Sequence, residues 1–481
     1  MLAAVLNNLG LTVADLDLWG YMAFGRLFWE GKQFPYRDVF AYVPTLDPWV
    51  YHEWLTGVIF YPIYQAVGPA GLQLLKYILG VATAALIFFT ALSRGAHPLS
   101  AAVVLWMIQF FTRIGYSPVR AQVFTYFFFA LYVYLLEQAR LKGRYRGLWA
   151  LAPIQVLWCN LHGGFPAGLG LIGIYGVGEA LSRRRFLPFF LALGAATLAT
   201  LINPYGLEYW TYVIRAVTMP RPEITEWASM ITAYKRGIVS LPEVLYLTVI
   251  AAFVILSAVW ARWRELTPIL ALGVTLYLAV SHIRHQVFFL LLAGAYLPQL
   301  FTAYWEAVIQ PRFPKADEWP RWVWLVPALT IAVWSIVFFA EFLNKKPLQL
   351  RVPPYPEKPG QIYYPVGAVD YIQKHRLSGN LVVDFNWGEY ALWRLYPQCR
   401  VALDGRYETV YPDAVCQEFF DFIYGREKWR QFLEHYPPDL ALIDPNAKIY
   451  PLLLEEPGWR QAYRDTGCAL FVRAETLVSP P

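Results

Sequence analysis

Charged residues and cysteines are scarce in this sequence. Asp, Glu, Lys and Arg make up 15% of its 481 residues, whereas soluble globular domains carry about 25%. Four cysteines are too few to staple a small secreted domain with disulfides. The low charge therefore argues against an ordinary soluble protein, and the low cysteine content argues against a disulfide scaffold.

The first residues resemble neither a signal peptide nor a complete membrane span. Residues 1–13 lack a basic start and a small-residue cleavage site. They are also shorter than the roughly 20 residues that a helical span needs. We expect this segment to lie at a membrane interface, or else a first membrane helix to be missing upstream.

Apolar and aromatic residues are abundant instead, at 57% and 17% of the chain. Apolar stretches of about span length recur from residue 54 to residue 342, although several have fewer than 18 residues. They predict an α-helical polytopic membrane protein with about 10–11 spans. The expected stretches are 54–67, 70–92, 98–112, 121–138, 147–161, 165–181, 186–202, 241–260, 266–281, 284–300 and 322–342.

The connecting loops fall into two groups, which predict an orientation. Short basic loops mark the cytoplasmic side, so the net charge of +6 is interpreted as loop charge and no nucleic-acid partner is expected. We therefore predict a multi-pass protein of the cytoplasmic (cell) membrane whose chemically interesting residues are extracytoplasmic. The basic loops contain residues 94, 140–146, 183–185, 262–264 and 312–321, and the outer loops 15–53, 113–120, 160–164, 203–240 and 281–286.

The composition changes near residue 344, after which short apolar strands alternate with helices. Such alternation predicts a small α/β domain, in which Cys399 and Cys416 either pair or stay as buried thiols. The predicted organisation is a first extracytoplasmic loop with juxtamembrane helices (1–53), a multi-span domain (54–343), a linker (344–364) and an extracytoplasmic α/β domain (365–481). Strands are expected at 380–384, 400–403, 440–443 and 468–473, and helices at 365–375, 387–395, 412–422 and 427–435.

The first loop carries two pairs of candidate functional residues. Asp15 and Asp17 would point the same way in an extended segment and could meet a metal, a phosphate or an acceptor hydroxyl. Alternatively, Asp17 caps a juxtamembrane helix that runs to about Glu30. His52 and Glu53 would diverge on a helix, so they are not expected to act as a dyad. They are interpreted either as cavity residues or as part of an aromatic interfacial belt.

Cationic residues stand at the outer ends of two predicted spans. Arg120 is one, and Arg284 with His285 forms the other. Guanidinium groups suit a lipid phosphate because they donate two parallel hydrogen bonds. The alternative is that these side chains reach to ordinary lipid headgroups.

Two further outer segments add polar candidates. Asn160 and His162 precede a glycine pair that favours either close approach of a ligand or a tight turn. Glu226 lies in an outer loop of about 38 residues, a length that is often functional. It is a candidate third acid.

These motifs in order resemble a bacterial and archaeal group of membrane proteins that are usually described as similar to GT-C glycosyltransferases. The series is D-x-D-L-W (15–19), G-R (25–26), P-W-x-x-H-E-W-L (48–55), N-x-H-G-G-F (160–165), N-P-x-G (203–206), E-W (226–227) and R-H (284–285). In the C-terminal domain, D-F-N-W-G-E-Y (384–390) and D-G-R (404–406) are similar to the tail of the same group.

The resemblance implies a reaction class. Such enzymes take a sugar from a polyprenyl phosphate or diphosphate, and an Asp of the first outer loop acts as general base with inversion at the anomeric carbon. By position that residue is Asp17, with Asp15 as the other candidate, while Arg284 and His285 would hold the lipid phosphate. The partners would be the lipid-linked sugar, membrane lipids and a glycan, lipid or protein acceptor. A divalent metal is possible, with Asp15, Asp17 and Glu226 as ligands.

Two other functions fit the composition. A transporter of lipid-linked substrate would be expected to show internal repeats and broken helices at mid-membrane, and the sequence shows no repeat. A non-catalytic scaffold would use the C-terminal domain to bind partners. The presence of both Asp15 and Asp17 favours the transferase.

Overall fold

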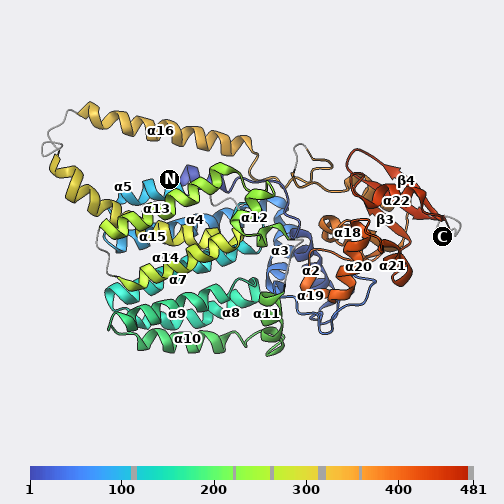
Figure 1. Ribbon diagram of the computed structural model, residues 1–481, viewed down its shortest axis with the longest axis horizontal. Coiled ribbons are helices and arrows are strands. Elements are labelled where there is room, and N and C mark those ends of the chain that lie inside the picture. The colour runs from blue at the N-terminus through green and yellow to red at the C-terminus, as the bar shows by residue number, and fades with distance from the viewer. Residues whose placement is uncertain (110–115, 220–223, 261–264, 313–320, 357–359, 475–481) are drawn as a thin grey trace. The chain divides into compact units, whose positions relative to one another are not determined.

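The computed structural model describes residues 1–109, 116–219, 224–260, 265–312, 321–356 and 360–474 (Figure 1). The chain divides into two compact units, each assembled from segments that are distant in sequence. Unit 1 comprises Met1–Thr12, Gln73–Leu207 and Val217–Gln349; unit 2 comprises Val13–Leu72, Glu208–Ala216 and Leu350–Pro481. Parts of the predicted loops and linker, namely residues 113–115, 220–223, 262–264, 313–320 and 357–359, lie outside the described residues.

Unit 1 is a bundle of helices in which α9 packs against α10 and α14, and α14 packs against α15 (Figure 1). The helices α9 and α10 each begin with a proline in the first turn, where its missing N–H costs no hydrogen bond. The long helices are α4 (Pro69–Ser93), α5 (Pro98–Gln109), α7 (Gln122–Lys142), α8 (Leu151–Leu161), α9 (Pro166–Leu181), α10 (Leu187–Ala199), α13 (Leu241–Trp260), α14 (Leu266–Ser281), α15 (Gln286–Tyr304) and α16 (Arg321–Asn344). Shorter ones are α1 (Leu2–Asn8), η1 (Tyr145–Ala150), η2 (Thr225–Trp227), α12 (Met230–Lys235), η3 (Ile283–His285), η4 (Trp305–Ile309) and η5 (Gln310–Arg312).

The apolar stretches predicted from the sequence are helical where the structure describes them. Two helical segments, Pro69–Ser93 and Ile283–Arg312, are long and apolar enough to cross a membrane by length and composition. Other apolar helices, such as Pro166–Leu181 and Leu266–Ser281, fall below 18 residues. The helical character is therefore confirmed, whereas the number of spans stays a prediction.

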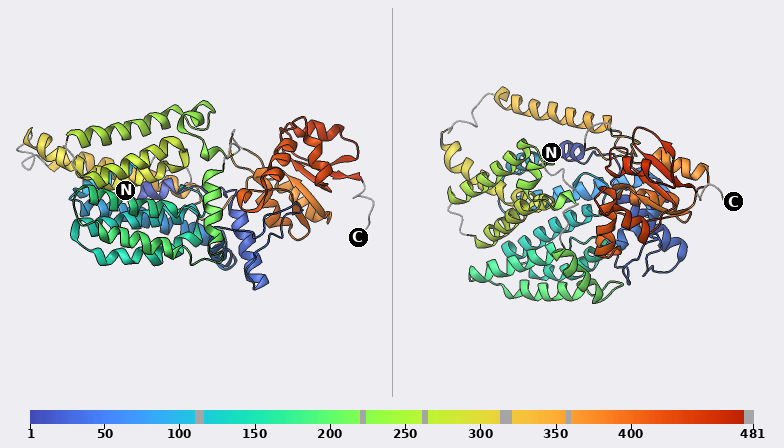
Figure 2. Two further views of the ribbon diagram at one scale, coloured as in Figure 1. Left: turned by 60° about the horizontal axis from the view of Figure 1, so that its bottom comes forward. Right: turned by 45° about the vertical axis from the view of Figure 1, so that its right-hand side comes forward.

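Unit 2 combines first-loop helices with a mixed sheet, seen from two further directions in Figure 2. The strand order is β2-β1-β3-β5-β4, with β1 parallel to β2 and β3, and with β5 antiparallel to β3 and β4. The strands are β1 (Gly379–Val383), β2 (Cys399–Val401), β3 (Leu440–Ile443), β4 (Trp459–Arg464) and β5 (Ala469–Arg473). The helices are α2 (Leu18–Gly31), α3 (Trp54–Val67), α11 (Glu208–Thr218), α17 (Val366–Lys374), η7 (Phe385–Trp387), α18 (Gly388–Leu395), α19 (Tyr407–Val410), α20 (Asp413–Ile423), α21 (Trp429–His435) and α22 (Ile449–Glu455).

The small α/β domain expected after residue 365 is present, with one strand more than predicted. The strand β3 is wholly buried and was predicted at its observed residues. The additional strand β4 lies at the sheet edge and mixes polar with aromatic side chains, so it lacks the apolar run of a buried strand. Cys399 and Cys416 are buried thiols and not a disulfide, which corrects the pairing alternative.

The first loop is part of this sheet unit. Ala41 forms a parallel bridge with Val401 beside β2, where the Val401 N–H donates to Phe40 O over 2.9 Å. Arg406 donates to both Asp38 and Asp404, and these three side chains are almost completely buried. Segments more than 350 residues apart in sequence thus share one core.

Candidate active site

The predicted first-loop acids form a tight turn ahead of α2. Asp15 Oδ1 accepts a hydrogen bond from the Asp17 N–H over 3.2 Å, so the Asp15 carboxylate stabilises the turn. Asp17 occupies the position before the helix, but its backbone is helical (φ −74°, ψ −14°). Residues that cap a helix with their own side chain usually have extended backbone. The side-chain cap considered for Asp17 is therefore not the role that this geometry favours.

A buried glutamate of the C-terminal motif meets the same turn. Glu389 Oε2 accepts a hydrogen bond from the Gly20 N–H over 2.9 Å. A Cβ atom at Gly405 would lie 2.8 Å from Glu389 Oε1 and 3.6 Å from Asp17 Oδ1. The two carboxylates therefore border the same glycine. Glu389 was not among the predicted site residues, although its motif was recognised.

The surroundings of Glu389 favour its neutral form. Burial raises its pKa well above the ordinary value, and the charges of Asp17 and Asp404 raise it further. Arg406 and the Gly20 N–H act in the opposite direction. The Glu389 carboxyl group therefore holds its proton to a higher pH than an ordinary glutamate.

Tyr51, His52 and Glu53 lie in the turn that precedes α3. His52 Nε2 is 3.5 Å from Glu53 Oε1, and His52 Nδ1 is 2.9 Å from the Tyr212 hydroxyl, whose ring stacks on the imidazole. The expectation that His52 and Glu53 diverge was wrong, because α3 begins only at Trp54 and these residues are not yet helical.

Tyr51 is a buried phenol among the acids of unit 2. Burial raises its pKa well above the ordinary value, and the charges of Glu389, Glu53 and Asp17 act in the same direction. Tyr51 is thus an unpredicted member of the group that contains the first-loop acids. Its position directly before the H-E-W sequence (52–54) was the available signal.

Unit 1 brings the predicted cationic residues together with Glu226. Arg120 Nη1 donates to Glu226 Oε1 over 2.9 Å, and the Arg284 guanidinium lies 4.7 Å from the centre of the Trp227 ring. Burial opposes ionisation of Glu226, but the charges of Arg120 and Arg284 and the hydrogen bond from Arg120 outweigh it and hold the pKa of Glu226 below its ordinary value. These residues, distant in sequence, form one electrostatic group.

His282 and the residue after it connect the segment that contains Arg284 to the segment that contains Glu226. His282 Nδ1 donates to Trp227 O over 2.8 Å, and the Ile283 N–H donates to Ala228 O over 3.1 Å. The His285 ring lies 5.9 Å from the Trp227 ring. Within the described part of the chain, His285 Nδ1 and Glu226 Oε2 are buried atoms with no hydrogen-bond partner. Such atoms are suited to a polar ligand.

His162 and Asn160 have different local roles. His162 Nδ1 accepts from the Gly164 N–H over 2.9 Å and lies 2.7 Å from Thr125 Oγ1, which assigns the proton of the neutral ring to Nε2. The Asn160 amide donates to Val156 O and to Ile202 O, at 2.7 and 2.9 Å. His162 therefore holds the turn at Gly164, while Asn160 ties two backbone segments together.

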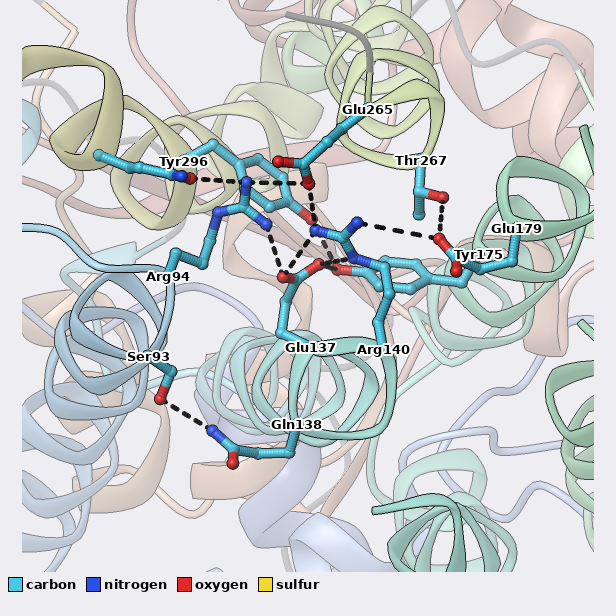
Figure 3. Close-up of polar contacts among 11 residues, drawn as sticks. Ser93, Arg94, Glu137, Gln138, Arg140, Tyr175, Glu179, Glu265, Thr267 and Tyr296 are labelled. Atoms are coloured by element: carbon cyan, nitrogen blue, oxygen red, sulfur yellow. Dashed lines mark hydrogen bonds and ion pairs between the residues drawn. The ribbon is translucent and has the colours of Figure 1, made fainter. Parts of the chain in front are cut away.

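A second polar cluster lies inside unit 1 (Figure 3). Glu137 accepts from Arg94 over 2.6 Å, from Arg140 over 3.1 Å and from the Tyr175 hydroxyl over 2.8 Å. Glu265 contacts both arginines from the start of α14. Arg94 follows the end of α4, in agreement with the predicted loop, whereas the loop placement of Arg140 was wrong because this residue lies within α7. Both arginines are buried against acids.

The residues predicted as possible metal ligands do not form a cluster among the described residues. Among the described residues, no three His, Cys, Asp or Glu side chains are grouped so that they could hold a metal ion. Asp15 accepts from a backbone N–H and Glu226 is paired with Arg120. Metal dependence therefore stays a prediction.

The chain is similar in fold to solved structures of an archaeal oligosaccharyltransferase, which is a GT-C fold glycosyltransferase. The apo form of the Archaeoglobus fulgidus oligosaccharyltransferase matches with a TM-score of 0.56 and 11% identity, over 98% of this chain and 74% of that chain. The same enzyme tethered through a disulfide to an acceptor peptide with an NVT sequon matches with a TM-score of 0.51 and 14% identity, over 98% and 73%.

These identities establish similarity of fold alone. No protein-family model matches the chain, and no curated protein matches it in sequence. The GT-C fold expected from the motifs is thus supported by structure and not by sequence relatives.

Proposed function

We propose that the protein is an integral-membrane glycosyltransferase that moves a sugar from a polyprenyl-phosphate-linked donor to an extracytoplasmic glycan, lipid or protein acceptor, with inversion. The observation that carries this proposal is the grouping of Arg120, Arg284 and His285 around Glu226 and Trp227. A GT-C fold supports the same reaction class.

The cationic group would receive the leaving phosphate. As the bond between the anomeric carbon and the phosphate oxygen breaks, that oxygen gains negative charge, which nearby guanidinium groups stabilise. Two arginines face one glutamate in this group, so a net positive charge is left for an anion. The buried Nδ1 of His285 adds a polar contact of the kind a headgroup uses.

The acceptor hydroxyl would be activated by Asp17. Its oxygen attacks the anomeric carbon from the face opposite the phosphate, and its proton passes to the carboxylate. General-base catalysis is typically worth about 10²–10⁴ in rate. We favour Asp17 over Asp15 because the resemblance places the base at Asp17 by position and because the Asp15 carboxylate stabilises the turn ahead of α2. His52 and Glu53 would assist from the same unit, with Tyr51 between the acids.

Membrane residence is supported by the surface of unit 1. The long helices α13 and α16 expose apolar side chains along their length, and Leu256 and Val259 are 67% and 71% exposed. An apolar surface of this kind is unfavourable in water and suits lipid. The location that we propose is the cytoplasmic membrane, with several passes and an extracytoplasmic site.

The test is sugar transfer by the purified full chain from radiolabelled polyprenyl-phosphate sugars, with Asp17→Asn and Asp15→Asn alongside. We expect Asp17→Asn to lose about 10²-fold or more in rate while it still binds donor. Asp15→Asn should keep most of the activity. Full transfer by Asp17→Asn would remove that residue as base. Absence of transfer from every donor, with specific capture of a protein by the chain, would favour a scaffold.

A further inference from the structure

The carboxylate of Glu226 has a partner on one oxygen and none on the other. Glu226 Oε1 accepts a hydrogen bond from Arg120 Nη1 over 2.9 Å. Glu226 Oε2 is buried and has no hydrogen-bond partner among the residues that the structure describes. Most buried polar atoms in proteins are paired, because an unpaired one keeps the cost of leaving water without a compensating bond. The Oε2 atom is therefore suited to a ligand that donates a hydrogen bond.

The ionisation state of Glu226 restricts the ligand groups that fit Oε2. Burial raises the pKa of Glu226, but the charges of Arg120 and Arg284 and the hydrogen bond from Arg120 hold this pKa below its ordinary value. At neutral pH the carboxylate is ionised, and it accepts hydrogen bonds without donating any. A phosphodiester is also an acceptor at neutral pH and carries no proton. The group that meets Oε2 is therefore a hydroxyl or an N–H, and not the phosphate of a lipid-linked donor.

His285 supplies a second buried atom of the same kind. Its Nδ1 has no hydrogen-bond partner within the described ranges, and its ring lies 5.9 Å from the ring of Trp227, which follows Glu226 in the chain. An imidazole nitrogen donates or accepts according to the tautomer, and a hydroxyl group can do both. Two unpaired polar atoms near one tryptophan match a ligand with several hydroxyls, such as a sugar, better than a hydrocarbon chain.

The arginines beside Glu226 narrow the ligand group to one part of the sugar. Under the proposed function the donor phosphate binds Arg120 and Arg284, and Arg120 also pairs with Glu226. In a glycosyl phosphate the phosphate is attached to the anomeric carbon. The hydrogen-bond donor nearest to the phosphate is then the hydroxyl or amide N–H on the neighbouring ring carbon, C2. This substituent is the part of the sugar that lies nearest to a carboxylate held by a phosphate-binding arginine.

We propose that Glu226 is a specificity-determining residue, whose Oε2 accepts a hydrogen bond from the hydroxyl or amide N–H on C2 of the donor sugar. The inference rests on the proposed function, which brings the donor phosphate to Arg120 and Arg284. A sugar that lacks this group leaves the buried Oε2 atom unpaired, and sites built around a hydrogen bond discriminate strongly against such analogues. The substrate class is a lipid-phosphate sugar with a hydrogen-bond donor at C2.

The test compares the binding of paired probes to the purified full chain by calorimetry in detergent micelles. The probes are short-chain polyprenyl phosphates of glucose, mannose, galactose and N-acetylglucosamine, their 2-deoxy counterparts, and polyprenyl phosphate without a sugar. Binding is measured, and not transfer, because removal of the C2 substituent also changes the reactivity of the anomeric carbon. We expect the wild type to bind at least one probe about 10- to 100-fold more tightly than its 2-deoxy counterpart, since the hydrogen bond has a charged acceptor.

Substitutions at Glu226 separate recognition of the sugar from a structural role. Glu226→Gln retains an acceptor for Arg120 and should reduce the preference over the 2-deoxy probe to about 3- to 10-fold, because a hydrogen bond between neutral groups is about half as strong. Glu226→Ala should abolish the preference. Its affinity for polyprenyl phosphate should stay within about twofold of the wild type or increase, because a negative charge near the phosphate is removed.

Glu306→Ala, at an exposed position of η4, is the matched control and should keep the wild-type preference for the C2 substituent. A preference that persists unchanged in both Glu226 variants would overturn the proposal. Equal weakening of all probes in these variants, polyprenyl phosphate included, would show a structural role and would overturn it as well.

The proposed function and the role of Glu226 can fail separately. If the chain binds polyprenyl phosphate and transfers sugar, but the wild type binds each sugar probe no more tightly than its 2-deoxy counterpart, recognition of C2 by Glu226 is wrong and the transferase stands. If the chain neither binds polyprenyl phosphate nor transfers sugar, the proposed function is wrong, and the role of Glu226 is rejected with it.

Discussion

Arg94 Nη1 lies 2.6 Å from Glu137 Oε2, and neither side chain is more than 1% exposed. In Figure 3 the Glu137 carboxylate stands between the guanidinium groups of Arg94 and Arg140. The Tyr175 hydroxyl donates to the same carboxylate. One acid thus connects the end of α4, the helix α7 and the helix α9 inside unit 1.

Removing the charge of Glu137 should destabilise the protein strongly. Glu137→Ala removes an acidic partner from two buried guanidinium groups, and breaking a buried pair in this way costs about 3–5 kcal/mol. We expect a clearly lower midpoint of thermal unfolding for the purified protein in detergent. Glu306→Ala, at an exposed position of the helical segment η4, is the control and should match the wild type. Equal midpoints for Glu137→Ala and the control would show that the cluster contributes nothing.

The same cluster shows where sequence reasoning fails. Arg94 and Arg140 stand next to apolar stretches, so a count of basic residues assigns them to loops. Their acidic partner Glu265 is 171 residues from Arg94 in sequence, and no local pattern announces such a pair. The helices themselves were predictable because apolar runs decide them locally.

The residues of the candidate site could be identified from the sequence, but most of the contacts between them could not. The ordered motifs contain Asp17, Glu226 and Arg284, and Arg120 was identified by its place at the end of a predicted span. The structure groups Arg120, Glu226 and Arg284. The contact between Gly20 and Glu389 spans 369 residues. The contact depends on Gly20 and Gly405, which leave room for the Glu389 carboxyl group. Neither the D-x-D-L-W motif nor the D-F-N-W-G-E-Y motif alone indicates that the two segments meet.

Arg284 should set the affinity for the donor phosphate. Arg284→Lys keeps the charge but loses the planar fork that gives two parallel hydrogen bonds and the stacking on Trp227. Loss of one charge-assisted hydrogen bond predicts about tenfold weaker binding of polyprenyl phosphate, measured by calorimetry in detergent micelles. The matched control is Arg312→Lys, whose side chain is exposed on η5. Unchanged affinity in Arg284→Lys would separate this residue from the phosphate.

Asp384 should make the stability of unit 2 dependent on pH. Burial, opposed by the Asn386 N–H and reinforced by the charge of Asp444, raises the pKa of Asp384 to about 6. A raised pKa means that the stabilisation is complete below the ordinary value near 4 and is lost as the pH rises through about 6. Asp384→Asn keeps the oxygen that accepts from Asn386 and removes the titration.

The difference in unfolding midpoint between Asp384→Asn and the wild type reports on Asp384 alone, because all other titrating groups are common to both proteins. We expect the unfolding midpoint of Asp384→Asn, relative to wild type, to rise between pH 4 and pH 7. Glu434→Gln, at an exposed position of α21, is the matched control for a carboxyl-to-amide change. A difference for Asp384→Asn that does not change with pH would mean that the carboxyl group ionises normally.

The fit between Gly20 and Glu389 predicts a compensating pair of substitutions. Gly20→Ala introduces a Cβ where the Glu389 carboxyl group lies, and such overpacking costs about 1–3 kcal/mol. Glu389→Asp alone shortens the side chain and lengthens the hydrogen bond to the Gly20 N–H. Combined, the shorter acid makes room for the methyl group. The double variant should therefore be more stable and faster in sugar transfer than the sum of the single effects allows, with a coupling of about 0.5–3 kcal/mol. Strict additivity, measured by thermal unfolding and by kcat, would mean that the two positions do not touch in the working protein.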